Sequence, residues 1–341
     1  MRVKTLSRPV ALAVALVVYA GGSALADDAP TDPPSTADTI AQQVNNVAPS
    51  ADVVPPTPGK DGDTLMADGS DIKVTAPVDN SGAVQVAPAD SPGDTIGIGL
   101  PGSGSGDAAV ASDGTITYQN AAPATDLAVQ PLDQSVRLET VVRDGTAPTS
   151  YTYPVNLPAG ASMAVQDDGS VLISGADGGS LGAFATPWAK DANGKDIPTR
   201  YEVQGDSLVQ VIDHTTTADV AYPVVADPWL WRDLIHSASW TYHSGYGWTL
   251  KVQPTDWQRF WNGYAPAVAG WNELYSKYKN HGLDTNLGSM KNQYLCHVLI
   301  VSWYAPNKST WDLDEWRPDV GLTDTINHKC NPGPGGFPGE W

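Results

Sequence analysis

The residues best suited to chemistry lie in the last third of the chain. Residues 312–319 read Asp-Leu-Asp-Glu-Trp-Arg-Pro-Asp, and their candidate acids or bases are Asp312, Asp314 and Glu315. Neighbouring carboxylates can act as an acid and a base, or they can bind a hard cation such as calcium. His243 stands next to Ser244 in a glycine-rich segment, where it is a candidate base beside a nucleophile.

Each of these groups also has an ordinary structural interpretation. Residues 312–319 would then form a solvated loop in which Arg317 pairs with a neighbouring carboxylate. Adjacent residues on a strand point to opposite faces, so the adjacency of His243 and Ser244 is weak evidence for catalysis. The sequence contains neither a G-x-S-x-G nor an H-E-x-x-H motif. Whether the protein is an enzyme therefore stays open at this level.

Tryptophan is the strongest compositional signal. Of the 12 tryptophans, all but Trp188 lie at or beyond Trp229. Exposed in a row, they would bind sugar rings or another protein, whereas buried they fill a core, as we expect for Trp271 and for most of the others. Five have polar residues or prolines around them and are our predicted exposed binding residues: Trp229, Trp231, Trp257, Trp261 and Trp316.

Charge divides the chain at the same place. Residues 27–228 hold 7 Lys and Arg against 28 Asp and Glu, whereas residues 229–341 hold 9 against 10. The acidic part repels nucleic acid and anionic lipid, so we expect no nucleic-acid partner.

The first 26 residues are typical of a secretory signal peptide. A basic start with Arg2, Lys4 and Arg8 precedes an apolar run over 10–20, and Ala24-Leu25-Ala26 forms a small-residue cleavage site. The apolar run is too short to span a bilayer. We therefore predict a secreted protein that is not transmembrane after cleavage.

The two cysteines, Cys296 and Cys330, most simply pair in an oxidising compartment. A loop of about 35 residues closed in this way stabilises the fold by roughly 3–4 kcal/mol. The alternative is a metal site that also uses His297 and His328, but the C-x-x-C spacing of zinc sites is missing. We predict a disulfide, no metal site and no cofactor.

Four segments follow from these patterns. After the signal peptide, residues 27–70 lack periodicity and large apolar groups, which predicts a disordered acidic linker. Residues 71–228 alternate short apolar runs with Asp-Gly turns, which predicts an all-β module, either an antiparallel sandwich or a meander. Residues 229–341 predict a small disulfide-bonded α+β module, with a hairpin over 239–253 and a helix over 265–279.

Two stretches are similar to known families. The motifs Trp240-Thr-Tyr-His-Ser-Gly-Tyr-Gly-Trp248, Val252-Gln-Pro-Thr255, Trp271-Asn-Glu-Leu274 and Trp316-Arg-Pro-Asp319 resemble the domain-of-unknown-function family numbered 2599. That family is known from secreted proteins of actinobacteria and related bacteria, and its cysteine pair matches the two cysteines of this chain. It has no established activity, so the resemblance implies no catalytic residue.

The second stretch runs from Asp94-Thr95-Ile96 through Pro187-Trp188-Ala189 to Tyr222-Pro-Val-Val-Ala-Asp-Pro228. It is similar to an N-terminal module of exported actinobacterial proteins, some of which resemble lactococcin-like bacteriocins. This resemblance implies a carrier or maturation module in front of an interchangeable effector.

Together these observations favour an exported protein that binds a bacterial-envelope component or a carbohydrate. They also fit an antagonistic effector that acts through such binding. The alternative is a secreted hydrolase of cell-wall or other extracellular polymer. It would combine His243 with a carboxylate from residues 312–319.

Overall fold

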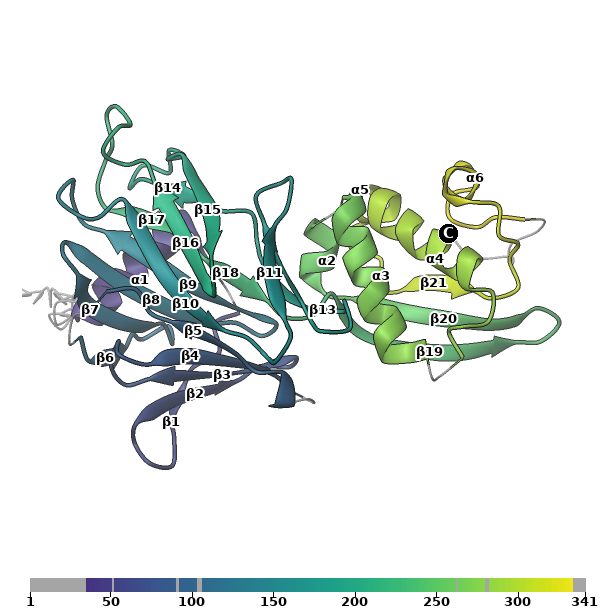
Figure 1. Cartoon of the computed structure of the whole chain (residues 1–341), viewed down its shortest axis with the longest axis horizontal. Helices are drawn as coiled ribbons and strands as arrows, with labels where there is room; N and C mark the ends of the chain where they lie inside the picture. Colours follow the sequence, from purple (N-terminus) through teal and green to yellow (C-terminus); the bar gives the residue numbers. More distant parts are fainter. Residues whose placement is uncertain are drawn as a thin grey trace, which may run out of the picture. The chain divides into compact units, whose positions relative to one another are not determined.

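The computed structural model describes residues 35–50, 52–89, 92–102, 106–261, 263–279 and 282–333 (Figure 1). The predicted signal peptide lies outside them. The modules described below belong to one compact unit, Pro34–Trp341. Among the described residues, no helix has both the length and the apolar character needed to cross a bilayer.

The N-terminal module contains two antiparallel sheets (Figure 1). The first comprises β1 (Thr57–Pro58), β2 (Thr64–Asp68), β3 (Ile72–Pro77), β4 (Ala83–Pro88), β5 (Ile96–Gly99), β10 (Ser150–Asn156), β15 (Thr199–Gln204) and β16 (Ser207–Ile212). Its strand order is β1-β2-β3-β4-β5-β10-β16-β15.

The second sheet comprises β6 (Ala108–Val110), β7 (Ile116–Ala122), β8 (Thr125–Pro131), β9 (Ser135–Val142), β11 (Ser162–Val165), β12 (Val171–Ser174), β13 (Ser180–Phe184), β14 (Ala189–Lys190), β17 (Val224–Ala226) and β18 (Trp229–Trp231). The order β11-β12-β13-β18-β9-β8-β7-β6 forms its main path, and β17 joins β14 to β9.

Alternating side chains explain why these strands form a sandwich. In β10, Tyr151, Tyr153 and Val155 are buried while the residues between them are exposed, as expected for a strand with one face in a core. The two sheets contribute to one hydrophobic core, for example through Ile98 from the first and Leu138 from the second. The predicted antiparallel β-sandwich is thus confirmed.

The predicted disordered linker is wrong for part of its length. Helix α1 (Thr36–Val47) begins at the N-cap Ser35, whose Oγ accepts a hydrogen bond from the backbone N–H of Asp38. Its apolar face packs on β8, β9 and β17, where Ile40 and Val44 are buried. Strands β1 and β2 also fall in this segment. The short apolar side chains of α1 are too few to predict a helix on their own, and the sheet beneath supplies the missing contacts.

An acidic residue is buried on the sheet face that α1 covers. Glu139 of β9 lies on the same face as Val141, which packs against α1. Its carboxylate oxygens have no hydrogen-bond partner among the described residues. Burial raises the pKa of Glu139 to about 8, because a charged carboxylate is poorly solvated there.

The C-terminal module is α+β, as predicted. Its three-stranded sheet has the order β19 (Ile235–His243), β20 (Gly247–Pro254) and β21 (Trp311–Asp314). The helical segments are α2 (Asp256–Phe260), α3 (Tyr264–Tyr278), α4 (Leu287–Cys296), the π-helical turn η3 (His297–Val301), α5 (Ser302–Tyr304) and α6 (Leu322–Asn327). Trp271 and Leu274 of α3 and Tyr294 of α4 form one core with Leu250 and Trp311 of the sheet.

The predicted boundary before Trp229 is wrong by a few residues. Strand β18 pairs with β9 and β13, so Trp229–Trp231 belongs to the β-sandwich. The change in tryptophan content predicted the boundary, but backbone pairing decides where the sandwich ends.

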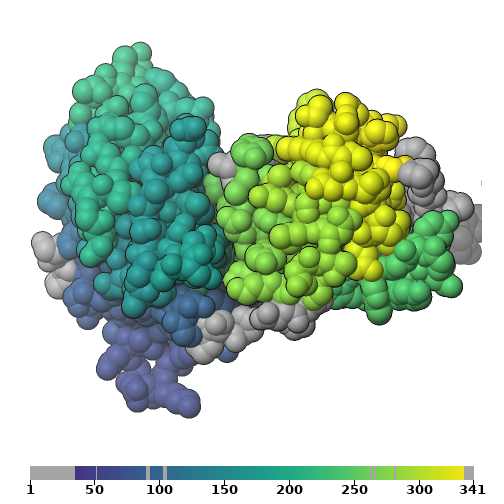
Figure 2. All heavy atoms as spheres, turned by 45° about the vertical axis from the view of Figure 1, so that its right-hand side comes forward, coloured from purple at the N-terminus to yellow at the C-terminus, as the bar shows by residue number. Residues whose placement is uncertain are grey.

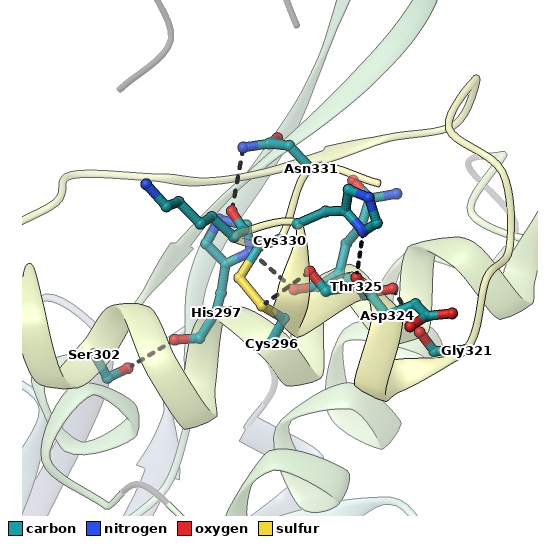
Figure 3. The surroundings of a disulfide bond; sticks show 11 residues. Cys296, His297, Ser302, Gly321, Asp324, Thr325, Cys330 and Asn331 are labelled. Atoms are coloured by element: carbon teal, nitrogen blue, oxygen red, sulfur yellow. Dashed lines mark hydrogen bonds between the residues drawn. A yellow bond between two sulfur atoms is a disulfide. The ribbon is translucent and has the colours of Figure 1, made fainter. Parts of the chain in front are cut away.

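The predicted disulfide joins Cys296, at the end of α4, to Cys330, which follows α6 (Figure 3). Both cysteines are fully buried. The neighbouring histidines donate to backbone carbonyls: His297 Nδ1 lies 2.8 Å from the oxygen of Gln293, and His328 Nδ1 lies 2.7 Å from that of Asp324. No group of three or more His, Cys, Asp or Glu in the described part of the chain is arranged to hold a metal ion.

Replacing both cysteines by alanine should lower the free energy of unfolding of the C-terminal module by roughly 3–4 kcal/mol, because the unfolded chain regains loop entropy. Denaturant unfolding of the full chain, followed by tryptophan fluorescence, measures this change. An unchanged midpoint in the double variant, or two free thiols found by mass spectrometry in protein from an oxidising host, would contradict it.

Glu139 should make the β-sandwich less stable as pH rises. Its raised pKa means that the folded state keeps the proton after the unfolded state has lost it, so stability falls between the normal pKa of a glutamate and about pH 8. Glutamine does not titrate, so the Glu139→Gln variant should lack roughly 3–5 kcal/mol of the decrease in unfolding free energy that the wild type shows over this pH range. The measurement is unfolding at a series of pH values, with Glu202→Gln on the surface of β15 as the matched control. Parallel pH profiles for the wild type and Glu139→Gln would refute the assignment.

Candidate functional site

The end of the β19–β20 hairpin carries exposed aromatic side chains. Tyr242 pairs directly with Trp248 across the hairpin, and their rings meet edge to face with centroids 5.1 Å apart. The side chains of Tyr242 and Trp248 are 59% and 44% exposed. Trp240 lies on the same face of β19, one pleat closer to the core, and is half-buried. The green atoms of this hairpin end lie at the surface in Figure 2.

A hollow of about 370 Å³ opens beside this aromatic surface, lined by Trp240, Trp248, Gly282, Thr285 and Glu315. Two indole rings and one carboxylate therefore face the same space. Gly282 has a φ of +94°, and a Cβ added there would be 3.9 Å from the ring of Trp240. The chain before α4 thus passes directly over this indole in a backbone conformation that favours glycine.

Backbone contacts place Glu315 in the hollow. Its N–H donates to the carbonyl oxygen of Trp248, which continues the β20–β21 ladder by one residue. One carboxylate oxygen, Oε1, accepts a hydrogen bond of 3.0 Å from the N–H of Trp248. The amide of Asn286 donates to the carbonyl oxygens of Glu315 and Arg317, which ties the loop before α4 to the loop after β21. The carboxylate is therefore held by the hairpin, and its position does not depend on a ligand.

His243 and Trp316 meet at the hairpin turn. Their rings lie 5.8 Å apart, and Tyr246 approaches Trp316 at the same centroid distance. Trp316 is half-buried and shields the turn. Of the predicted binding tryptophans, Trp316 alone joins the hairpin surface, and of the predicted acids only Glu315 lines the hollow.

Asp314 has a structural role instead. Its side chain is 1% exposed and forms an ion pair of 2.5 Å with Arg317, whose side chain is 3% exposed. Its other carboxylate oxygen accepts from the hydroxyl of Thr249 at 2.6 Å. Both carboxylate oxygens thus have partners within the fold, which gives Asp314 a structural role. Asp312 is half-buried and accepts from the hydroxyl of Thr310 at 2.9 Å.

The other predicted binding tryptophans stack on one another. Trp231 and Trp257 are 7% and 4% exposed, so the prediction that they are exposed is wrong. Trp229 and Trp261 are half-buried at the two ends of the stack, with centroids 4.9 Å from Trp231 and 4.6 Å from Trp257. This stack joins the β-sandwich to α2, since the four rings form one apolar cluster with residues of both.

The two outer tryptophans of the stack have hydrogen-bond partners, whereas the buried indole nitrogen of Trp231 has none among the described residues. The indole nitrogens of Trp229 and Trp261 donate to Ser135 Oγ at 2.9 Å and to Asp168 Oδ2 at 2.7 Å. The guanidinium of Arg137 lies 4.1 Å from the ring centroid of Trp229. These partners, Ser135, Arg137 and Asp168, come from segments distant in the sequence, so the polar residues next to the tryptophans did not reveal that the rings stack against the β-sandwich.

Sequence reasoning missed the aromatic residues that do reach the surface. The signal was the alternation Trp240-x-Tyr242, followed after the turn by Trp248, which places all three on one face of a hairpin. Trp303 of α5 was also missed, although it is 80% exposed and far from the hairpin in sequence.

Replacing Asp314 by asparagine should destabilise the protein by about 3–5 kcal/mol, because it leaves the buried guanidinium of Arg317 without its carboxylate. Asp312→Asn, two residues away on the same strand, should cost about 0.5 kcal/mol or less. Thermal and denaturant unfolding of both variants measures the difference. Equal stabilities would contradict the structural role of Asp314.

The comparisons with known proteins concern the same part of the chain. Residues 235–333 match the family described as "Protein of unknown function (DUF2599)". "Uncharacterized protein Rv0477" of Mycobacterium tuberculosis and "Uncharacterized protein Mb0487" of Mycobacterium bovis are each 31% identical over 88 residues, which is 25% of this chain and 57% of theirs. "Uncharacterized protein ML2452" of Mycobacterium leprae is 25% identical over 103 residues, 30% of this chain and 72% of its own.

The chain thus spans just over half the length of the first of these relatives. No solved structure shows a significant match to the chain. The matched residues include the hairpin, the hollow and the disulfide, and exclude the β-sandwich. The C-terminal module is therefore similar to the DUF2599 family.

Proposed function

We propose that this protein is exported and that its C-terminal module binds a component of the bacterial envelope through the end of the β19–β20 hairpin. The observation that supports this best is the aromatic surface of Tyr242 and Trp248 beside a hollow with a second tryptophan and a carboxylate. Large aromatic side chains supply most of the energy at binding surfaces, and their exposure in a group marks such a surface.

The β-sandwich would then serve as a carrier for the binding module, in keeping with its resemblance to modules of exported bacteriocin-like proteins. An antagonistic effector would use the same attachment to reach its target cell. The acidic charge of the chain, −19 overall, disfavours anionic nucleic acid as the target.

A hydrolase of envelope polymer is the alternative. Only one observation favours it: His243 and Glu315 both lie at the hairpin turn, where the rings of His243 and Trp316 are in contact and the carboxylate of Glu315 lies beside Gly247. Asp314 is held in the ion pair with Arg317, so Glu315 would have to supply the carboxylate.

Retention of the purified full chain on mycobacterial cell envelopes tests the binding proposal. Trp248→Ala and Tyr242→Ala should each reduce retention by about fivefold or more, since each removes a large part of the contact. Trp303→Ala is the matched control, because it removes an exposed tryptophan outside the hairpin and should leave retention unchanged.

No retention of the wild type, or equal loss in all three variants, would defeat the proposal. Soluble fragments released from the envelopes by the wild type, and not by His243→Ala, would instead support the hydrolase.

A further inference from the structure

We infer that the hollow between Trp240, Trp248 and Glu315 binds a protonated primary amine carried on an alkyl chain or a sugar ring. This inference rests on the proposed function and names the chemical group that the envelope component would present. The supporting observations are the charge, the two indole rings and the hydrogen-bond acceptors that line the hollow.

The charge in the hollow is negative. Glu315 takes part in none of the ion pairs between described residues, and its carboxylate accepts one hydrogen bond, from the N–H of Trp248. Arg317, the nearest cation in the sequence, is paired with Asp314. Glu315 is the one charged residue among the described residues that line the hollow, and the exposed Asp284 and Lys279 of the neighbouring segment carry opposite charges. A ligand with a positive charge is thus complementary to the hollow.

The walls suit the same ligand. Trp240 and Trp248 both line the space in which Glu315 lies, and indole is the aromatic ring that attracts cations most strongly. An alkyl chain or the apolar face of a sugar ring also packs well on an indole. A carboxylate between two indoles would therefore hold the charged end of a ligand while the rings hold its apolar part.

Hydrogen-bond acceptors favour a primary over a quaternary amine. An ammonium group carries three donors. The carboxylate of Glu315 and the hydroxyl of Thr285 are two acceptors at the lining of the hollow, and its open side admits water as a third. A quaternary ammonium has no donors and would leave these acceptors unused.

Binding of small probes to the full chain tests this inference. Nα-acetyl-lysine amide carries a free ammonium, and its Nε-acetylated form has the same chain without the charge. Glucosamine and N-acetylglucosamine form the corresponding pair of sugars, and tetramethylammonium is the quaternary probe. The indole N–H resonances of Trp240 and Trp248, assigned by Trp→Phe variants, report binding by NMR.

We expect the free amines to shift both resonances, and acetylation to weaken binding by about tenfold or more, because it removes a hydrogen bond between charged groups. Glu315→Gln should weaken amine binding by a similar factor, whereas Asp312→Asn, in the strand β21 that precedes Glu315, should not. Glutamine keeps the acceptor for the N–H of Trp248, and unchanged resonances of the remaining tryptophans would show that the variant is folded.

Several results would overturn the inference: no shift with either amine, equal binding of the acetylated probes, tighter binding of tetramethylammonium, or amine binding that Glu315→Gln leaves unchanged. Comparing lysine-derived with sugar-derived amines tells which source the hollow prefers.

Competition in the envelope assay separates this inference from the proposed function. If neither free amine nor Glu315→Gln reduces retention on envelopes, the hollow does not bind an amine of the envelope, and the proposal of envelope binding is unaffected. Amine binding without any retention would refute envelope binding alone.

Discussion

The geometry of the hairpin end depends on how the short edge strand β21 is held, because Glu315 follows it directly. The side-chain amide of Gln293 on α4 accepts from the N–H of Asp314 at 2.8 Å and donates to its C=O at 2.9 Å. The same C=O also accepts from the N–H of Arg317 at 3.3 Å. The carboxylate of Asp314 binds Arg317 and Thr249. Every polar group at this end of the strand thus has a partner, which is the condition for a buried polar network to be rigid. The network around Asp314 thus fixes the end of β21 and, with it, the position of Glu315, although the carboxylate of Glu315 takes no part in that network.

Tryptophan has two opposite roles in this chain, and hydrogen bonding helps to distinguish them. In the stack from Trp229 to Trp261, the outer indole nitrogens reach side-chain acceptors of the β-sandwich. These two hydrogen bonds lower the cost of burying the outer rings, and the stack joins α2 to the sandwich. On the hairpin, Trp248 is exposed. The amino-acid composition does not distinguish the stacked tryptophans from those of the hairpin. Only the strand register and the neighbouring elements show which of them are buried.

The sequence predicted the fold class well because its signals are local. Alternation in β10 and the apolar face of α3 each depend on a few neighbouring residues, and two cysteines allow only one pairing within the chain. It failed at α1, and alternation does not mark β8, whose residues are all buried and include Asp126 and Gln130. Fully buried strands do not alternate, so no pattern marks them. The hollow was missed because it joins three segments distant in the chain, near residues 240–248, 282–285 and 315.

Two electrostatic effects of different range act on any cation that reaches the hollow. The chain carries a formal charge of −19, which attracts cations generally and raises the rate of encounter. That field is screened over about 8 Å at physiological salt, so it cannot select one amine among many cations. Selection must come from groups in direct contact, where Glu315, the two indoles and Thr285 act at short range. Under the proposed function, the acidic β-sandwich would favour encounter with cationic surfaces in general, while the nearly neutral C-terminal module would select the group that is retained.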